Sequence, residues 1–230
     1  HLQGHVSRVR EQDARGISRT SNPSVRIGVD ARHLTGGNPS GIGQYTLALL
    51  GAMAAAHPEH DFLILSTGSP HKAKPNAEQA LGNLLERPHV THVHRSIINR
   101  VLNFSILLTG RPSFERLFGV PVDVIWCPNI NFLPRTNTPL VVTFHDLSYA
   151  MMPRLYSLRR RLWHTLVRPK AIARRASALI VPSKTTAMDL ERLYEITTPN
   201  PSLKRRGIEV IPHGVDEMFS PRPQPQDHGV

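Results

Sequence analysis

The segment 140–144 most constrains what this chain can fold into. Its residues, Leu-Val-Val-Thr-Phe, are apolar or β-branched without the alternation of a half-exposed strand. Such a run is typical of a strand that is covered on both faces, as in a parallel sheet. Short apolar runs recur along the chain, and the expected strands are 25–30, 62–65, 121–127, 140–144 and 176–183, with an alternating strand at 90–94 and a last strand and glycine turn at 207–216.

Segments with helical spacing separate these runs, so strands and helices alternate. This alternation predicts an α/β fold with one doubly wound, mostly parallel sheet. The predicted domain spans 25–216; the polar residues 1–24 are expected to be a disordered leader, and the proline-rich residues 217–230 a linker or tail. The expected helical segments are 44–56, 78–86, 97–118 with a break at 110–112, 154–175 divided at Pro169, and 184–195 capped by Ser183.

A histidine and an aspartate directly follow the central strand. In open α/β sheets, ligands bind outside the carboxyl ends of the strands, so His145 and Asp146 stand where chemistry is expected. The alternative is structural: His145 caps the next turn, and Asp146 starts it. This stretch alone does not decide between the two interpretations.

Glycines occupy a second strand end. Asp30 closes the first expected strand, a loop follows, and Gly41-Ile-Gly43 precedes the helical segment. Backbone N–H groups of glycines can approach an anion, and a helix amino terminus adds partial positive charge. The loop is therefore a phosphate cradle or a tight turn that needs small residues. It matches neither G-x-G-x-x-G nor a Walker loop, which argues against a dinucleotide dehydrogenase or a P-loop NTPase.

The composition is basic, and the excess is concentrated in one region. The chain has 28 Lys and Arg against 17 acidic residues, a formal charge of +11, which favours an anionic partner. Residues 147–188 contain no Asp or Glu. A leucine stripe runs through 154–175, so this segment is either a basic amphipathic helix on anionic lipid or a core-facing helix with a solvated basic face. The basic residues here are Arg154, Arg159, Arg160, Arg161, Arg168, Lys170, Arg174, Arg175 and Lys184.

Several function classes are disfavoured. The single cysteine, Cys127, excludes an internal disulfide and a cysteine-built metal site. The sequence contains no run of 18 apolar residues, so no transmembrane helix is predicted. His89, His92 and His94 lack an accompanying carboxylate, so no metal site is expected. A nucleic-acid-binding protein is an alternative that the charge raises, but no zinc-finger or RRM signature supports it.

Four motifs in this order resemble the amino-terminal domain of family 4 glycosyltransferases, the retaining enzymes of the GT-B type. These enzymes have two Rossmann-like domains. The opening motif looks most like the mannosyltransferase-type members that build bacterial surface polysaccharide. The motifs are Val29-Asp-Ala-Arg with Ser40-Gly-Ile-Gly-Gln-Tyr-Thr46, Thr143-Phe-His-Asp-Leu147, Ala178-Leu-Ile-Val-Pro-Ser-Lys-Thr-Thr186 and Val210-Ile-Pro-His-Gly-Val-Asp216.

The resemblance implies a reaction and a set of roles. A hexose would pass from a nucleotide-sugar to a glycan or lipid-linked acceptor with retention, without a metal or other cofactor. His145 would sit beside the transferred sugar, and Asp146 would support that turn. The residues implied at the donor and acceptor site are Asp30, Gly41, Ile42, Gly43, Tyr45, Ser183, Lys184, His213, Gly214 and Asp216.

The resemblance also implies a second Rossmann-like domain, which in the family carries most of the nucleotide-binding residues. The sequence stops where that domain is expected to begin. We therefore expect a chain that is inactive alone and is completed by a second domain or subunit. The rival interpretation is a non-catalytic half-domain that binds an acceptor or partner. A cytoplasmic location is expected, with peripheral contact at the inner face of an anionic membrane through 154–175.

Overall fold

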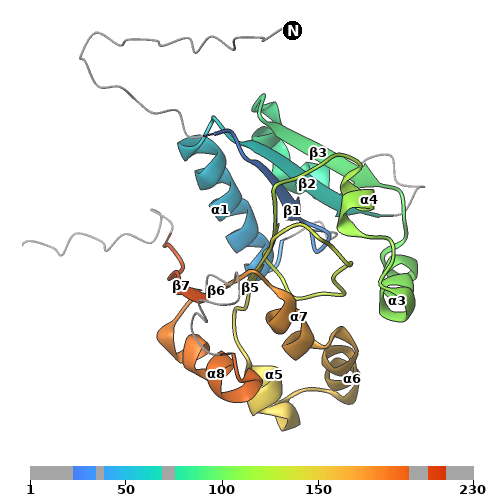
Figure 1. Cartoon of the computed structure of the whole chain (residues 1–230), viewed down its shortest axis with the longest axis vertical. Helices are drawn as coiled ribbons and strands as arrows, with labels where there is room; N and C mark the ends of the chain where they lie inside the picture. Colours follow the sequence, from blue (N-terminus) through green and yellow to red (C-terminus); the bar gives the residue numbers. More distant parts are fainter. Residues whose placement is uncertain (1–22, 35–38, 69–75, 197–206, 216–230) are drawn as a thin grey trace, which may run out of the picture.

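The computed structural model describes residues 23–34, 39–68, 76–196 and 207–215. Nearly all of the predicted leader and the whole predicted tail lie outside these ranges, as does Asp216. Within them, a single sheet of seven parallel strands forms the centre of the molecule (Figure 1). The strands are β1 Arg26–Asp30, β2 Asp61–Thr67, β3 Val90–Arg95, β4 Val124–Cys127, β5 Leu140–Thr143, β6 Ala178–Val181 and β7 Gly207–Val210.

The order in which strands are added to the sheet reverses between β1 and β4, in the middle of the sheet. The order is β3-β2-β1-β4-β5-β6-β7, so the chain builds outward from β1 in one direction and from β4 in the other. Val29 of β1 pairs with Ile64 on one side and with Trp126 of β4 on the other. This is the doubly wound, Rossmann-like order, and the edge between β1 and β4 is its topological switch point. The predicted fold class is confirmed.

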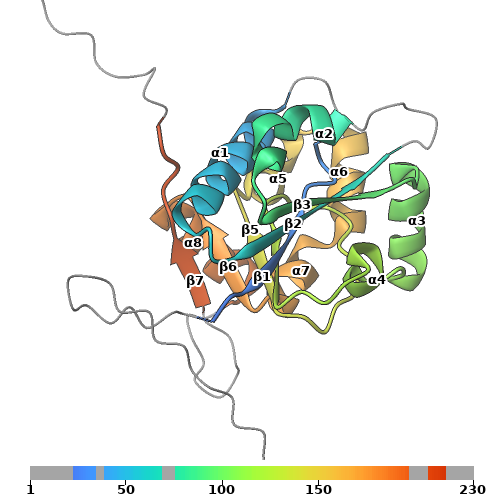
Figure 2. The same cartoon turned by 90° about the horizontal axis from the view of Figure 1, so that it is seen from above.

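Helices cover both faces of the sheet. Figure 2 shows α1 and α2 on one side of the strands and α4 and α7 on the other. Short turns of 3₁₀ helix lie at 82–86 and 153–155. The helices are α1 Gly41–Ala56, α2 Asn76–Leu81, α3 Asn99–Thr109, α4 Phe114–Phe118, α5 Ser148–Met151, α6 Leu158–Val167, α7 Pro169–Arg175 and α8 Lys184–Tyr194.

Each face of the sheet has its own apolar core. On one face, Leu50 and Ala54 of α1 pack with Phe62 and Ile64 of β2, all of them fully buried. The other core is larger and joins α3, α4, α7 and α8 to the strands; Phe144, directly after β5, is fully buried in it. Burial on both faces explains why the strands read as continuous apolar runs.

Most element boundaries lie within a few residues of those expected, and one difference matters for the site. Helix α1 begins at Gly41, three residues earlier than expected, because the Ser40 side chain accepts a hydrogen bond from the amide of Gly43. The glycines therefore form the first turn of the helix, not a loop before it. The expected break near Pro169 is present, with Arg168 in the left-handed conformation between α6 and α7.

One carboxylate holds the β4–β5 connection against α4. Glu115 accepts hydrogen bonds from Thr136 Oγ1 at 2.6 Å and from the amide of Asn137 at 3.0 Å. Thr138 adds contacts from its amide and its hydroxyl. Partial burial would raise the pKa of Glu115, but these hydrogen bonds outweigh it and lower the pKa from 4.5 to about 2.

This lowered pKa predicts a pH dependence of folding stability. The stabilisation from Glu115 is fully present above pH 4.5 and is lost as the pH falls toward about 2, because the folded state then resists protonation that the unfolded chain accepts. Glu115→Gln should flatten the dependence of the urea midpoint on pH in this window. The exposed Glu78 provides the control, Glu78→Gln. Equal pH profiles for Glu115→Gln and the parent chain would contradict this assignment.

Candidate functional site

His145, just beyond the carboxyl end of β5, is bonded to the residue that follows β4, next to the switch point of the sheet. His145 lies two residues after β5, and its Nε2 is 2.8 Å from the carbonyl oxygen of Pro128, the residue that follows β4. Since all strands are parallel, the ends of β1, β4 and β5 meet at one edge of the sheet. His145 is therefore held at the point where ligands bind in open α/β sheets.

Three rings from three separate elements converge at this point. Tyr45 of α1 meets His145 edge-on, with ring centroids 4.9 Å apart, and lies 4.7 Å from the ring of His213. The two histidine rings are 5.4 Å apart. Trp126 of β4 meets Tyr45 edge-on, with ring centroids 6.3 Å apart, and donates its indole N–H to Thr143 Oγ1. We call Tyr45, His145 and His213 the ring cluster.

The hydrogen bond to Pro128 determines what His145 can do. A carbonyl oxygen only accepts, so Nε2 carries the proton and Nδ1 keeps a free lone pair in the neutral ring. Burial lowers the pKa of His145 and outweighs the hydrogen bond to Pro128, which raises it; His213 lowers the pKa further, and Asp146 has the smallest, opposing effect. The ring is therefore neutral at pH 7. It can accept a hydrogen bond at Nδ1.

The amino terminus of α1 lies one helical turn from Tyr45. Among the described residues, the amides of Gly41 and Ile42 have no hydrogen-bond acceptor, whereas that of Gly43 is bonded to Ser40. The two glycines differ in their surroundings. A Cβ at Gly41 would meet nothing within 4 Å, but one at Gly43 would lie 2.9 Å from Cβ of Pro39. Gly43 is thus required by packing, whereas Gly41, with respect to the described residues, leaves open space beside two N–H groups that have no acceptor.

Asp146 has the local role that the structural interpretation gave it. Its carboxylate accepts hydrogen bonds from the amide of Ser148, at 2.8 Å, and from the Ser148 hydroxyl. Ser148 is the first residue of α5, so Asp146 fixes the turn between His145 and that helix. No hydrogen bond of the described residues joins Asp146 to the ring cluster.

Asp30 is hydrogen-bonded to Arg32, a residue that the sequence analysis did not identify. Arg32 donates to both carboxylate oxygens of Asp30, each at 2.7 Å, and both residues are buried. Arg32 also donates to the carbonyl of Phe132. Next in the chain, His33 bonds to the hydroxyl of Thr46, and burial lowers the pKa of His33. The only sequence signal for Arg32 and His33 is their position directly after a strand that ends in Asp30.

The remaining predicted residues lie at the same edge but outside the cluster. Ser183 caps α8, accepting from the amide of Thr186 at 3.1 Å, as predicted, and Lys184 is exposed beside it. Strand β6 lies between β5 and β7, so both residues stand between the ends that carry His145 and His213. Gly214 is exposed. Neither Ser183 nor Lys184 has a hydrogen bond or ring contact with the cluster among the described residues.

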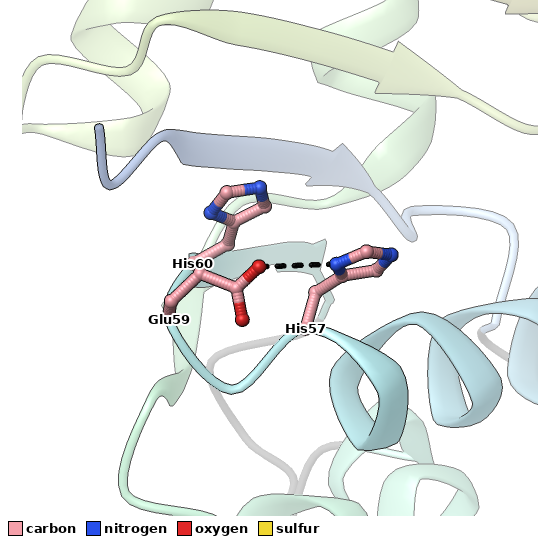
Figure 3. Close-up of side chains that lie close together, drawn as sticks. All are labelled: His57, Glu59 and His60. Carbon is pink, nitrogen blue, oxygen red and sulfur yellow. Dashed lines mark hydrogen bonds and ion pairs between the residues drawn. The ribbon is translucent and has the colours of Figure 1, made fainter. Parts of the chain in front are cut away.

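Histidines elsewhere have local partners. His92 and His94 both bond to the hydroxyl of Ser66. Figure 3 shows a second group at the start of β2, where His57, Glu59 and His60 bring possible metal-ligand atoms within 4.8 Å of one another. His57 Nδ1 and Glu59 are already paired at 3.1 Å, both half-exposed, at the amino end of the sheet. The expectation that no metal takes part remains a prediction.

A profile of the family described as Glycosyltransferase Family 4 matches residues 39–218. Among solved structures, the chain is similar to the N-terminal domain of a trehalose-6-phosphate phosphatase from Candida albicans, with 14% sequence identity and a TM-score of 0.42. That match covers 90% of this chain and 52% of the other, so the chain spans about half the length of that structure. No curated protein matches the chain significantly.

Proposed function

The chain belongs to Glycosyltransferase Family 4, and we propose that it forms the acceptor-side half of an enzyme that transfers a hexose from a nucleotide-sugar, with retention. The acceptor in this proposal is a glycan or a lipid-linked glycan, and mannose is the hexose favoured by the opening motif. A second Rossmann-like domain or subunit would complete the donor site. The observation that supports this most is the ring cluster at the switch point, one helical turn from the free amides of α1.

The amino terminus of α1 would stabilise the diphosphate leaving group. As the bond between sugar C1 and the diphosphate oxygen breaks, negative charge develops on the diphosphate. Backbone N–H groups aimed at that charge stabilise it, and the helix dipole adds to the effect. Gly41 and Ile42 supply free N–H groups, and the space beside Gly41 admits a ligand. The acceptor hydroxyl then bonds to C1 as its proton leaves to the diphosphate or to water.

The ring cluster would bind the sugar. The face of an aromatic ring packs against the C–H groups of a hexose, and the partly exposed Tyr45 with the exposed His213 would provide such a surface. His145, neutral and protonated on Nε2, accepts a hydrogen bond from a sugar hydroxyl at Nδ1. This positions the sugar and polarises the hydroxyl without making His145 a nucleophile. Asp146 contributes by fixing the backbone that carries His145.

Turnover on the protein isolated from its source tests the proposal. It would be incubated with UDP-, GDP- and ADP-linked hexoses and an acceptor extract, in the presence of a chelator, and release of nucleoside diphosphate would be measured. We expect one nucleotide-sugar to be consumed and NMR of the product to show the anomeric configuration of the donor. Acceptor binding without consumption of any nucleotide-sugar would overturn the proposal in favour of a non-catalytic binding module.

A further inference from the structure

Helix α6 turns its apolar row away from the core. Leu158, Leu162 and Leu166 are spaced by four residues and so lie along one side of the helix. Their exposed fractions are 79%, 59% and 38%, whereas Val167 on the opposite side is 5% exposed. Leu155, just before the helix, is 76% exposed. A surface helix normally directs its apolar stripe inward. The arrangement here is reversed.

The opposite side of α6 is anchored, which fixes this orientation. The ring of Trp163 packs edge-on against Phe132, with centroids 6.3 Å apart. His164 stacks on Tyr149 at 4.1 Å with an interplanar angle of 6°. Tyr156 contacts the same histidine. Rotating the helix to bury the leucines would break these contacts. The interpretation of this segment as a core-facing helix is therefore wrong for the leucine row.

Arginines border the leucine row. With about 100° between successive residues of a helix, Arg159 and Arg161 fall on either side of the row formed by Leu158, Leu162 and Leu166. All of these arginines, with Arg160 between them, are exposed. No acidic residue occurs from 147 to 188 to neutralise them. The exposed face thus combines a linear apolar stripe with uncompensated positive charge.

Helix α3 carries a second outward apolar row. Val101, Phe104 and Leu108 are 60%, 62% and 66% exposed, and Ile98 before the helix is 50% exposed. The buried side of α3 is formed by other residues, so this helix too is anchored by its inner face. Figures 1 and 2 both place α3 and α6 on the same side of the molecule. Two helices on this side of the molecule therefore each carry an exposed apolar row.

We infer that α6, supported by α3, docks the protein on an anionic lipid surface. Leucine and phenylalanine side chains at the headgroup level would leave water, and the arginines would meet lipid phosphates. A second copy of the chain fits this surface poorly, because self-association through α6 would bring two uncompensated rows of arginine together. The inference concerns where the protein works, so it holds or fails independently of the reaction proposed above.

Cosedimentation of the full chain with vesicles tests the docking. We expect binding to phosphatidylcholine vesicles that contain phosphatidylglycerol, weakening as salt is raised, and little binding to pure phosphatidylcholine. Leu158→Ser with Leu162→Ser should reduce the partition coefficient at least tenfold. Arg159→Gln and Arg161→Gln should each reduce it about fivefold. Phe104→Ser should reduce it as well if α3 takes part.

Matched changes on α8 serve as controls, because α8 lies on the other side of the molecule in both views. Met188, 67% exposed, gives the apolar control Met188→Ser, and Arg192 gives the charge control Arg192→Gln. Both should bind vesicles like the parent chain. Equal binding to neutral and anionic vesicles, or equal losses in the α6 and α8 variants, would overturn the inference. A concentration-dependent mass abolished by Leu162→Ser, without vesicle binding, would instead assign the surface to self-association.

Discussion

Arg32→Met is expected to destabilise the domain by about 3–5 kcal/mol, because it leaves a buried charge without its partner. Asp30 and Arg32 are 4% and 3% exposed, and they are joined by two hydrogen bonds of 2.7 Å. Removal of the guanidinium leaves the carboxylate of Asp30 buried without a compensating charge. The carbonyl of Phe132 loses a donor as well. The midpoint of urea unfolding, followed by circular dichroism, measures the loss.

A double-mutant cycle separates the charge effect from lost packing. Asp30→Asn combined with Arg32→Met buries no charge, so the pair should cost much less than the sum of the single changes. Arg32→Lys keeps the charge and loses the bidentate geometry, and it provides a soluble variant if Arg32→Met fails to fold. A loss below about 1 kcal/mol for Arg32→Met, with additive costs in the cycle, would show that the pair contributes little.

His145→Ala is expected to lower kcat by about 10²–10³-fold, with a much smaller change in the Kd for the nucleotide. His145 lies in the ring cluster and not beside the α1 amides, so we expect it to act on the sugar and not on the diphosphate. The measurement is turnover with the nucleotide-sugar identified in the screen above, alongside nucleotide binding by calorimetry. His57→Ala, at the exposed amino end of the sheet, is the matched control.

The pH profile gives His145 a second readout. If the neutral imidazole is the active form, turnover falls as the pH drops through the pKa of His145, which burial holds below the ordinary value of 6.5. His145→Ala should remove this acidic limb, a result that misfolding alone would not produce. His145→Gln, which keeps a polar side chain, should recover part of the rate. Turnover unchanged by His145→Ala would remove this residue from the mechanism.

The sheet could be predicted because its signal is local. Each strand is a short run of apolar residues buried on both faces, and such a run is recognised from neighbouring residues alone, although helices elsewhere in the chain cover it. The helix start at Gly41 was harder to predict. Ser40 and the glycines are compatible with both a loop and a first turn, and only the hydrogen bond from the amide of Gly43 to Ser40 distinguishes them.

Contacts between distant residues account for what the sequence did not predict. Tyr45, His145 and His213 were each named as site residues, yet nothing in their spacing indicates that the three rings meet. The bond from His145 to Pro128 spans two strands and determines which nitrogen carries the proton. The sequence did not reveal the role of Arg32, because a buried arginine can be predicted only when its acidic partner is known. That partner is Asp30, which the sequence placed at the ligand site instead.

By itself, the sequence determined the fold class, the positions of the strands and the edge of the sheet that carries the candidate site, because apolar runs and the alternation of strands with helices can be recognised from neighbouring residues. Only the tertiary structure decided the protonation pattern of His145, the pairing of Asp30 and the outward direction of the leucines on α6. An amphipathic helix has the same sequence whichever side it buries. The ring contacts of Trp163 and His164 anchor the other side of α6 to the domain, and this determines which side of the helix is exposed.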